Sequence, residues 1–379
     1  MTEWYDISHL LELSATEKIL GLCTPLIVYI AFFVIQLILP GRRVPGYVIN
    51  PETGKPRNYR LNGIWVFSVV LAIWWFELTG MPRDWFYRSS VFAVIGGTFF
   101  TAVFSFITFF SQPKEKRKKP IKAWWTGSAQ EVSWFNERFD MKMYFYAAGG
   151  TILVLNVMSA TWYHYERFGS NSNPGMFLYM AFFTFYILDY FVSERVTLYT
   201  YDMMHEGVGF KLFWGGLVIY GWLFPLPIWG MTVLPNPGFG AGWENFWLIG
   251  TGLIFLIGWA ISRGSNLQKY TFKRWPERKF LGIKPEYIEA AGDRKILCSG
   301  FWGVARHVGY LGEGLIGIAF ALSFGYFSNP WAWTYLIFIV SMFTQRQLSD
   351  DRHCAEKYGP EYWTQYQARV KYRICPGIY

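Results

Sequence analysis

Carboxylates that could handle a proton gather just after a long apolar segment of the chain. The carboxylates are Asp189, Glu194, Asp202 and Glu206, and His205 lies between the last two. Ionisable groups at membrane depth cost about 2.5–3.5 kcal/mol on insertion scales, so they are candidates for function. Asp202 and Glu206 are four residues apart, so on a helix they would share a face. One of two neighbouring carboxylates can stay protonated near neutrality and could protonate an alkene; the alternative is an interfacial turn with solvated carboxylates.

A second polar group lies at the head of another apolar segment. Arg306, His307 and Glu313 fall within the string from Gly300 to Glu313, which is rich in small residues. Arginine suits bidentate contacts to a phosphate, and the small residues allow close backbone approach. The alternative is an arginine that reaches lipid headgroups, with His307 capping a helix.

A third polar group is spaced in fours towards the end of the chain. Arg346, Asp350, Cys354 and Tyr358 would form a slowly rotating line along one side of a helix. Such a line could follow an extended ligand from a phosphate to a ring, although an amphipathic helix lying on the membrane has the same pattern. Lys269 and Lys273, also four apart, could hold a phosphate or anchor a cytoplasmic helix end.

The elements that must position these residues are membrane helices. Hydrophobic residues make up 53% of the 379-residue chain and charged residues only 16%, against about 25% charged in soluble proteins. A membrane helix needs about 20 mostly apolar residues. We therefore predict an all-α, polytopic transmembrane bundle of nine to ten spans. The predicted spans are 18–39, 62–79, 90–112, 143–162, 175–193, 211–234 and 244–262, with two more in 303–345 separated at Ser328–Pro330.

The charges in the loops predict the orientation. Basic residues concentrate in 40–61, 113–142 and 263–300, which lie on one side if every span crosses once, and the opposite loops are nearly bare. The positive-inside rule makes the basic side cytoplasmic, with the N-terminus outside and the C-terminal tail inside. The net charge of +9 is thus explained by membrane topology rather than by nucleic-acid binding. The four cysteines are scattered and suggest neither a disulfide framework nor a metal site.

Several strings in residues 266–379 resemble the sterol reductase family, which includes the Δ14-sterol reductases, the 7-dehydrocholesterol reductases and the membrane domain of the lamin B receptor. SGFWGVARH at 299–307 is most similar to 7-dehydrocholesterol reductase. The strings QKYTFKRWP, GIKPEYIEA, DDRHCAEKYGPEYW and YRICPGIY also resemble the family. Earlier in the chain, Phe139–Lys142 resembles the family's F-D-x-K, and 202–206 resembles its D-x-x-H-D.

The resemblance implies a ten-helix fold that reduces a sterol carbon–carbon double bond with NADPH bound from the cytoplasmic side. It implies that 1–265 line the sterol pocket and that 266–379 form the NADPH-binding subdomain. Asp202 and Glu206 would lie near the alkene, and Tyr366 would be a proton source. The implied cofactor-binding residues are Lys269, Lys273, Leu297, Trp302, Arg306, His307, Tyr310, Glu313, Arg346, Asp350, Cys354 and Tyr358.

The chain departs from the family pattern at several positions. Gly309 replaces an asparagine, Glu313 an aspartate, Ser349 an arginine, and Ala147–Gly150 a G-R-P-G string. NADPH binding remains the expectation, but the reduced bond is open, with Δ7 favoured and Δ14 next. The substrate would enter from the bilayer, and the short loops favour a bacterial inner membrane over the endoplasmic reticulum.

Three other functions fit part of the pattern. An isoprenylcysteine-type membrane methyltransferase shares an R-H-P-x-Y core, but Val308 and Gly309 stand around that proline position. A non-catalytic sterol-binding protein would explain the loss of the arginine at Ser349 and of the asparagine at Gly309. A transporter is the weakest alternative, because the chain shows no inverted repeat.

Overall fold

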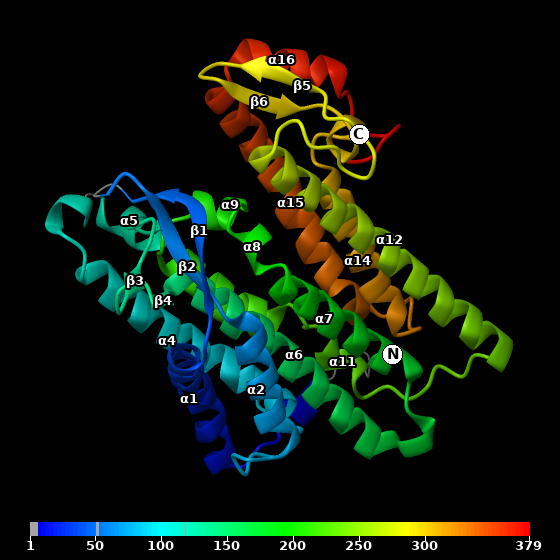
Figure 1. The fold of residues 1–379 in the computed structure, drawn as a ribbon. Helices are drawn as coiled ribbons and strands as arrows, with labels where there is room; N and C mark the ends of the chain where they lie inside the picture. Colours follow the sequence, from blue (N-terminus) through cyan, green and yellow to red (C-terminus); the bar gives the residue numbers. More distant parts are fainter. Residues whose placement is uncertain (1–6, 51–52, 118) are drawn as a thin grey trace. The chain divides into compact units, whose positions relative to one another are not determined.

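The computed structural model describes residues 7–50, 53–117 and 119–379. The chain forms two compact units, Met1–Pro237 and Gly238–Tyr379. The predicted functional division at residue 265 is a separate hypothesis. Figure 1 shows the first unit from blue to green and the second from yellow to red.

The first unit is built around α6 (Met141–Phe168), most of whose side chains are buried. Asp140 begins this helix, its carboxylate accepting a hydrogen bond of 3.0 Å from the Met143 N–H, as expected of an N-cap. The helices α2, α3 and α7 and the π-helix η5 pack against α6, while α1 packs against α4. The bounds of this unit's helices are η2 Ser8–Leu10, α1 Ala15–Ile38, α2 Gly63–Trp75, α3 Trp85–Arg88, α4 Ser90–Phe110, η3 Lys114–Arg117, α5 Pro120–Thr126, η4 Gly169–Asn171, α7 Pro174–Val192, α8 Glu194–Thr197, α9 Tyr201–Met204, α10 Phe210–Trp214, η5 Gly215–Leu223 and α11 Ile228–Met231.

Among the residues that the structure describes, the predicted loops contain three small antiparallel hairpins, which were not expected from the sequence. In the first unit β1 (Arg42–Ile49) pairs with β2 (Pro56–Leu61), and β3 (Ser133–Trp134) with β4 (Phe139–Asp140). In the second unit β5 (Tyr287–Ala290) pairs with β6 (Arg294–Leu297), in register from Tyr287 opposite Leu297 to Ala290 opposite Arg294. Basic side chains mask the alternating pattern in β1, β2 and β6, whereas β3 and β4 are only two residues long.

The second unit packs α14 (Val308–Ser323) between α12 (Ala241–Arg274) and α15 (Pro330–Tyr358), as Figure 1 shows. The predicted break within 303–345 is confirmed as a break between two helices: α14 ends at Ser323, and Asn329 caps α15. The remaining helices are α13 Phe301–Val304 and α16 Pro360–Arg369, the latter packed on β5.

Within the described residues, six helices are long and apolar enough to cross a membrane. They are Ala15–Ile38, Ser90–Phe110, Met141–Asn171, Pro174–Val192, Phe210–Met231 and Gly242–Arg274. Gly63–Trp75 and Val308–Ser323 are apolar but shorter. The mostly helical membrane fold is thus confirmed, whereas the count of nine to ten spans stays a prediction. At 34 residues, α12 is about 50 Å long, so one end extends beyond a hydrocarbon core of about 30 Å.

Candidate active site and cofactor site

In the first unit, Asp202 lies on the short helix α9 and contacts α6. The Tyr146 hydroxyl of α6 donates a hydrogen bond of 2.9 Å to Oδ2 of Asp202. Tyr190 of α7 stacks on the Tyr146 ring at 5.5 Å, and Tyr220 of η5 meets it edge-on at 6.5 Å. The Asp202 carboxylate therefore adjoins a group of tyrosines drawn from three helices.

Glu206 lies outside α9, so the expectation that a helix places it on one face with Asp202 is wrong. The helix ends at Met204, and the following loop turns so that the Val208 N–H donates to the Ala129 carbonyl at 2.7 Å. Glu206 forms an ion pair of 2.7 Å with the exposed Lys211. Each carboxylate has its own partner, an alcohol for Asp202 and an ammonium for Glu206.

Glu194, also in the first polar group, is 5% exposed and caps another helix. Its Oε1 accepts a hydrogen bond of 2.9 Å from the Gly63 N–H at the start of α2. Burial raises the pKa of Glu194 to about 8, and the Gly63 bond opposes that rise. His205, by contrast, is exposed.

In the second unit, lysines from two helices converge on Cys354. Lys269 interacts electrostatically with Cys354, Asp350 and Arg346, and its Nζ lies 5.3 Å from the centre of the Trp302 ring. Lys273 interacts with Lys269 and Cys354. The structure thus brings together predicted cofactor residues from the end of α12 and the polar half of α15.

Lys357 joins this group, which we call the lysine cluster (Lys269, Lys273 and Lys357). It interacts with both other lysines and with Cys354. Burial lowers the pKa of Lys357, and Lys269 lowers it further. Sequence reasoning missed this lysine; its position three residues after Cys354 on the same helix was the available signal. Burial also raises the pKa of the Cys354 thiol to about 11, so Cys354 is a neutral packing group rather than a thiolate.

Arg306 and His307 point towards the C-terminal segment. Nη1 of Arg306 donates to the carbonyls of Val370 and Lys371 at 2.8 and 3.0 Å. Nε2 of His307 lies 3.1 Å from Oδ1 of Asp351, whose other oxygen pairs with Arg373 at 3.1 Å. Burial alone would raise the pKa of Asp351, but its bond to His307 and the charge of Arg373 hold that pKa below the ordinary value. Both residues are therefore engaged inside the protein, and their contact with a phosphate stays a prediction.

The other predicted cofactor residues in this unit have defined contacts. Tyr310 donates to Asp350 and stacks between His307 and Phe343, at 5.4 and 4.2 Å. Glu313 accepts a hydrogen bond from the Ser262 hydroxyl. Tyr358 stacks on Trp363 at 6.4 Å.

Tyr366, the predicted proton source in this unit, is 2% exposed. Its hydroxyl donates to the Trp302 carbonyl at 3.0 Å, and burial raises its pKa well above the ordinary value. In this state the phenol supports the Trp302 turn, and its catalytic role stays a prediction.

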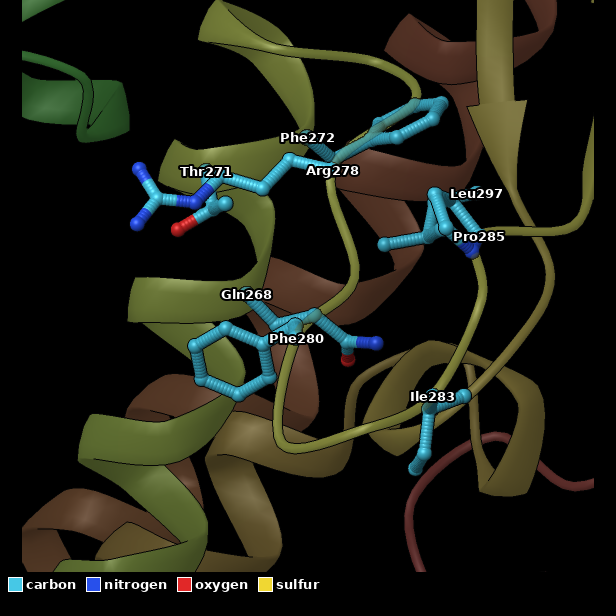
Figure 2. Close-up of a pocket in the computed structure, with 8 residues that line it drawn as sticks. All are labelled: Gln268, Thr271, Phe272, Arg278, Phe280, Ile283, Pro285 and Leu297. Atoms are coloured by element: carbon cyan, nitrogen blue, oxygen red, sulfur yellow. The ribbon is translucent and has the colours of Figure 1, made fainter.

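A small pocket lies beside the lysine-bearing end of α12 (Figure 2). Arg278 extends over Thr271 of α12, while Leu297 and Pro285 lie on the opposite side. Gln268 accepts from the Phe301 N–H at 2.9 Å and donates to the Ser299 carbonyl at 3.1 Å, and so holds the turn that carries Trp302. The lining residues are Gln268, Thr271, Phe272, Arg278, Phe280, Ile283, Pro285 and Leu297.

The side chains around the lysine cluster fit a phosphorylated dinucleotide such as NADPH. Three lysine side chains, with Arg346 near Lys269, could pair with its phosphates. The indole of Trp302 and the ring of Tyr358 provide flat surfaces of the kind on which a base or nicotinamide stacks.

The helices that are long and apolar enough to cross a bilayer define the class, an integral membrane protein. More specifically, the chain belongs to the ergosterol biosynthesis ERG4/ERG24 family, whose pattern matches residues 7–379. The predicted family is confirmed, and the protein is a sterol reductase acting on a carbon–carbon double bond.

Relatives of this chain carry two different activity names. It is 31% identical to the Δ14-sterol reductase of Methylotuvimicrobium alcaliphilum, over 93% of this chain and 82% of that protein. It is 30% identical to the Δ14-sterol reductase of Arabidopsis thaliana, over 92% of this chain and 95% of the relative. The 7-dehydrocholesterol reductase of Xenopus laevis is 28% identical, over 89% of this chain and 73% of that protein.

Proposed function

We propose that the protein reduces the Δ14 double bond of a sterol, with NADPH as the hydride donor. The similarity to two Δ14-sterol reductases at 31% and 30% identity supports this choice. The Δ7 bond favoured by the sequence is the second candidate, supported by the string SGFWGVARH. The observation that carries the cofactor proposal is the convergence of Lys269, Lys273 and Lys357, with Lys269 beside Trp302.

The proposed chemistry needs an acid, because an alkene without conjugation to a carbonyl is a poor hydride acceptor. Asp202 is the proposed proton donor, and its proton would lie on the carboxylate that Tyr146 contacts. Glu206, whose carboxylate pairs with Lys211, is close in sequence and could exchange protons with solvent. NADPH, when bound, supplies the hydride. Positive charge that develops on a ring carbon would be stabilised by nearby aromatic faces, by about 0.5–2 kcal/mol.

The proposal includes the setting of the reaction. The apolar helices make this an integral membrane protein, and a sterol would reach it from the bilayer. We propose that the lysine cluster faces the cytoplasm, where NADPH is available, because the most basic loops of the sequence belong to that side.

The first experiment incubates the detergent-purified protein with NADPH and separate Δ7, Δ14 and Δ24 sterols, and identifies products by mass spectrometry. Reduction of the Δ14 sterol supports the proposal, and reduction of the Δ7 sterol alone establishes the second candidate. Recovery of every sterol unchanged would overturn the proposed activity.

A double substitution separates the acid from the cofactor site. Asp202→Asn with Glu206→Gln should abolish turnover and leave NADPH affinity unchanged, because neither residue belongs to the lysine cluster. Full activity in this variant would move the proton donor elsewhere.

A further inference from the structure

Two residues one turn apart on α6 hold the segment that carries Asp202. Lys142 donates a hydrogen bond of 2.9 Å from Nζ to the Met203 carbonyl. Tyr146, four residues on, donates one of 2.9 Å to the Asp202 carboxylate. Residues i and i+4 lie above one another on a helix, so one face of α6 contacts both the side chain of Asp202 and the backbone beside it.

Lys142 is itself fixed by a buried ion pair. Its side chain is 2% exposed and that of Glu131 is 3% exposed, and Nζ lies 2.9 Å from Oε1 of Glu131. Burial raises the pKa of the neighbouring Asp140, and the charge of Glu131 raises it further. A buried ammonium needs such a partner, because an unpaired buried charge is strongly destabilising. The pair therefore makes Lys142 a rigid donor to the Met203 carbonyl.

The loop that supplies Glu131 also packs on the chain beyond Asp202. A Cβ added to Gly127 would lie 2.5 Å from the backbone of both Gly207 and Val208, so the two loops are in backbone contact. The Val208 N–H donates to the Ala129 carbonyl at 2.7 Å. Residues 202–206 are thus held at both ends, by α6 on one side and by the 127–131 loop on the other.

We propose that Tyr146 and the Lys142–Glu131 pair are positioning residues that fix the Asp202 carboxylate for proton transfer. The inference rests on the proposed function, in which Asp202 is the acid. Under this proposal, Tyr146, Lys142 and Glu131 act in the proton-transfer step and not in cofactor binding.

The test compares Tyr146→Phe with Tyr144→Phe. The second variant is the control: it removes a buried hydroxyl of the same helix, and that hydroxyl donates to the Tyr29 carbonyl rather than to Asp202. Tyr146→Phe should lower kcat about 10- to 100-fold, the factor for losing a hydrogen bond to a charged group. KM for the sterol and affinity for NADPH should stay unchanged. Tyr144→Phe, by contrast, should leave both kcat and KM as in the wild type.

A second pair of variants tests the lysine contact. Lys142→Gln alone leaves Glu131 charged and buried, so this protein is expected to be unstable. Lys142→Gln combined with Glu131→Gln removes both charges and should fold, with lower kcat and unchanged KM. Wild-type kcat in the folded double variant would overturn the role of the pair.

The outcomes separate this inference from the proposed function. If the wild type reduces no sterol, the proposed function fails and the inference falls with it. If the wild type is active and Tyr146→Phe behaves like Tyr144→Phe, the inference alone is overturned.

Discussion

At the scale of single residues, Lys357 belongs to the lysine cluster although no sequence motif pointed to it. It stands within the string DDRHCAEKYGPEYW, where the spacing in fours drew attention to Cys354 and Tyr358 instead. Its interaction with Lys269 and Lys273 depends on the packing of both α12 and α15 against α14, which the sequence does not give.

We predict that Lys357→Ala weakens binding of NADPH more than binding of NADH. A charge-assisted hydrogen bond contributes about 1.5–3 kcal/mol, so the loss should be about 10- to 100-fold in affinity. The exposed Lys284 gives the matched control, and Lys284→Ala should bind as the wild type. Isothermal titration with both nucleotides measures the effect. Equal weakening for NADPH and NADH would place Lys357 away from the phosphate that distinguishes them.

Glu194 leads to a prediction about stability. Its pKa of about 8 in the folded protein exceeds the unfolded value of about 4.3. The folded state therefore binds an extra proton between these values, and stability is highest below pH 4.3 and falls as pH rises through 8. Glu194→Gln keeps the acceptor for Gly63 and removes the titration.

The midpoint of thermal unfolding of the wild type in detergent should fall from pH 6 to 9, and Glu194→Gln should flatten that decline. The loss in the free energy of unfolding of the wild type should reach a few kcal/mol at pH 9, because each pKa unit corresponds to about 1.4 kcal/mol. Parallel profiles for the two proteins would contradict the assigned burial effect.

At the scale of elements, the second unit depends on close contact between α12 and α14. A Cβ added to Gly312 would lie 2.5 Å from the Ser262 nitrogen and 2.7 Å from the Gly258 oxygen. Two helix backbones can approach this closely only where side chains are absent. The small residues noted in the sequence thus serve helix packing as well as any ligand.

We predict that Gly312→Ala destabilises the protein by about 1–3 kcal/mol, the usual cost of overpacking. Gly314→Ala is the matched control, because nothing lies within 4 Å of a Cβ at that position on the same helix. It should be neutral or stabilise by about 0.5–1 kcal/mol through helix propensity. Unfolding followed by fluorescence-detected size exclusion distinguishes the two, and equal midpoints would refute the contact.

At the scale of the whole molecule, the orientation of the chain in the membrane stays a prediction. The run from Lys114 to Lys122 and the poorly charged 235–243 fall on opposite sides if the predicted spans 143–162, 175–193 and 211–234 each cross once. The positive-inside rule places the basic run in the cytoplasm.

In a cysteine-free background, Lys114→Cys should resist an impermeant maleimide in intact cells, and Gly240→Cys should react. Both positions are exposed, so both should react after the cells are permeabilised. Labelling of Lys114→Cys in intact cells would reverse the predicted orientation.

The sequence by itself determined the membrane class, the family and the break before α15. Those features depend on local hydropathy, on turn residues such as Asn329 and Pro330, and on contiguous motif strings. It also marked Lys269 with Lys273, and Cys354 with Arg346, Asp350 and Tyr358, because helical spacing is a local rule.

Only the tertiary structure decided which distant residues meet. Tyr146 and Asp202 are 56 residues apart, and Lys142 reaches Glu131 and Met203 in separate segments. Glu206 lies outside the expected helix because the chain turns after α9, so that the Val208 N–H bonds to the Ala129 carbonyl, which is a tertiary contact. Arg306 looked free for a phosphate, yet the fold supplies it with the carbonyls of Val370 and Lys371. Burial and partner choice arise from packing between elements, and spacing along one chain does not encode them directly.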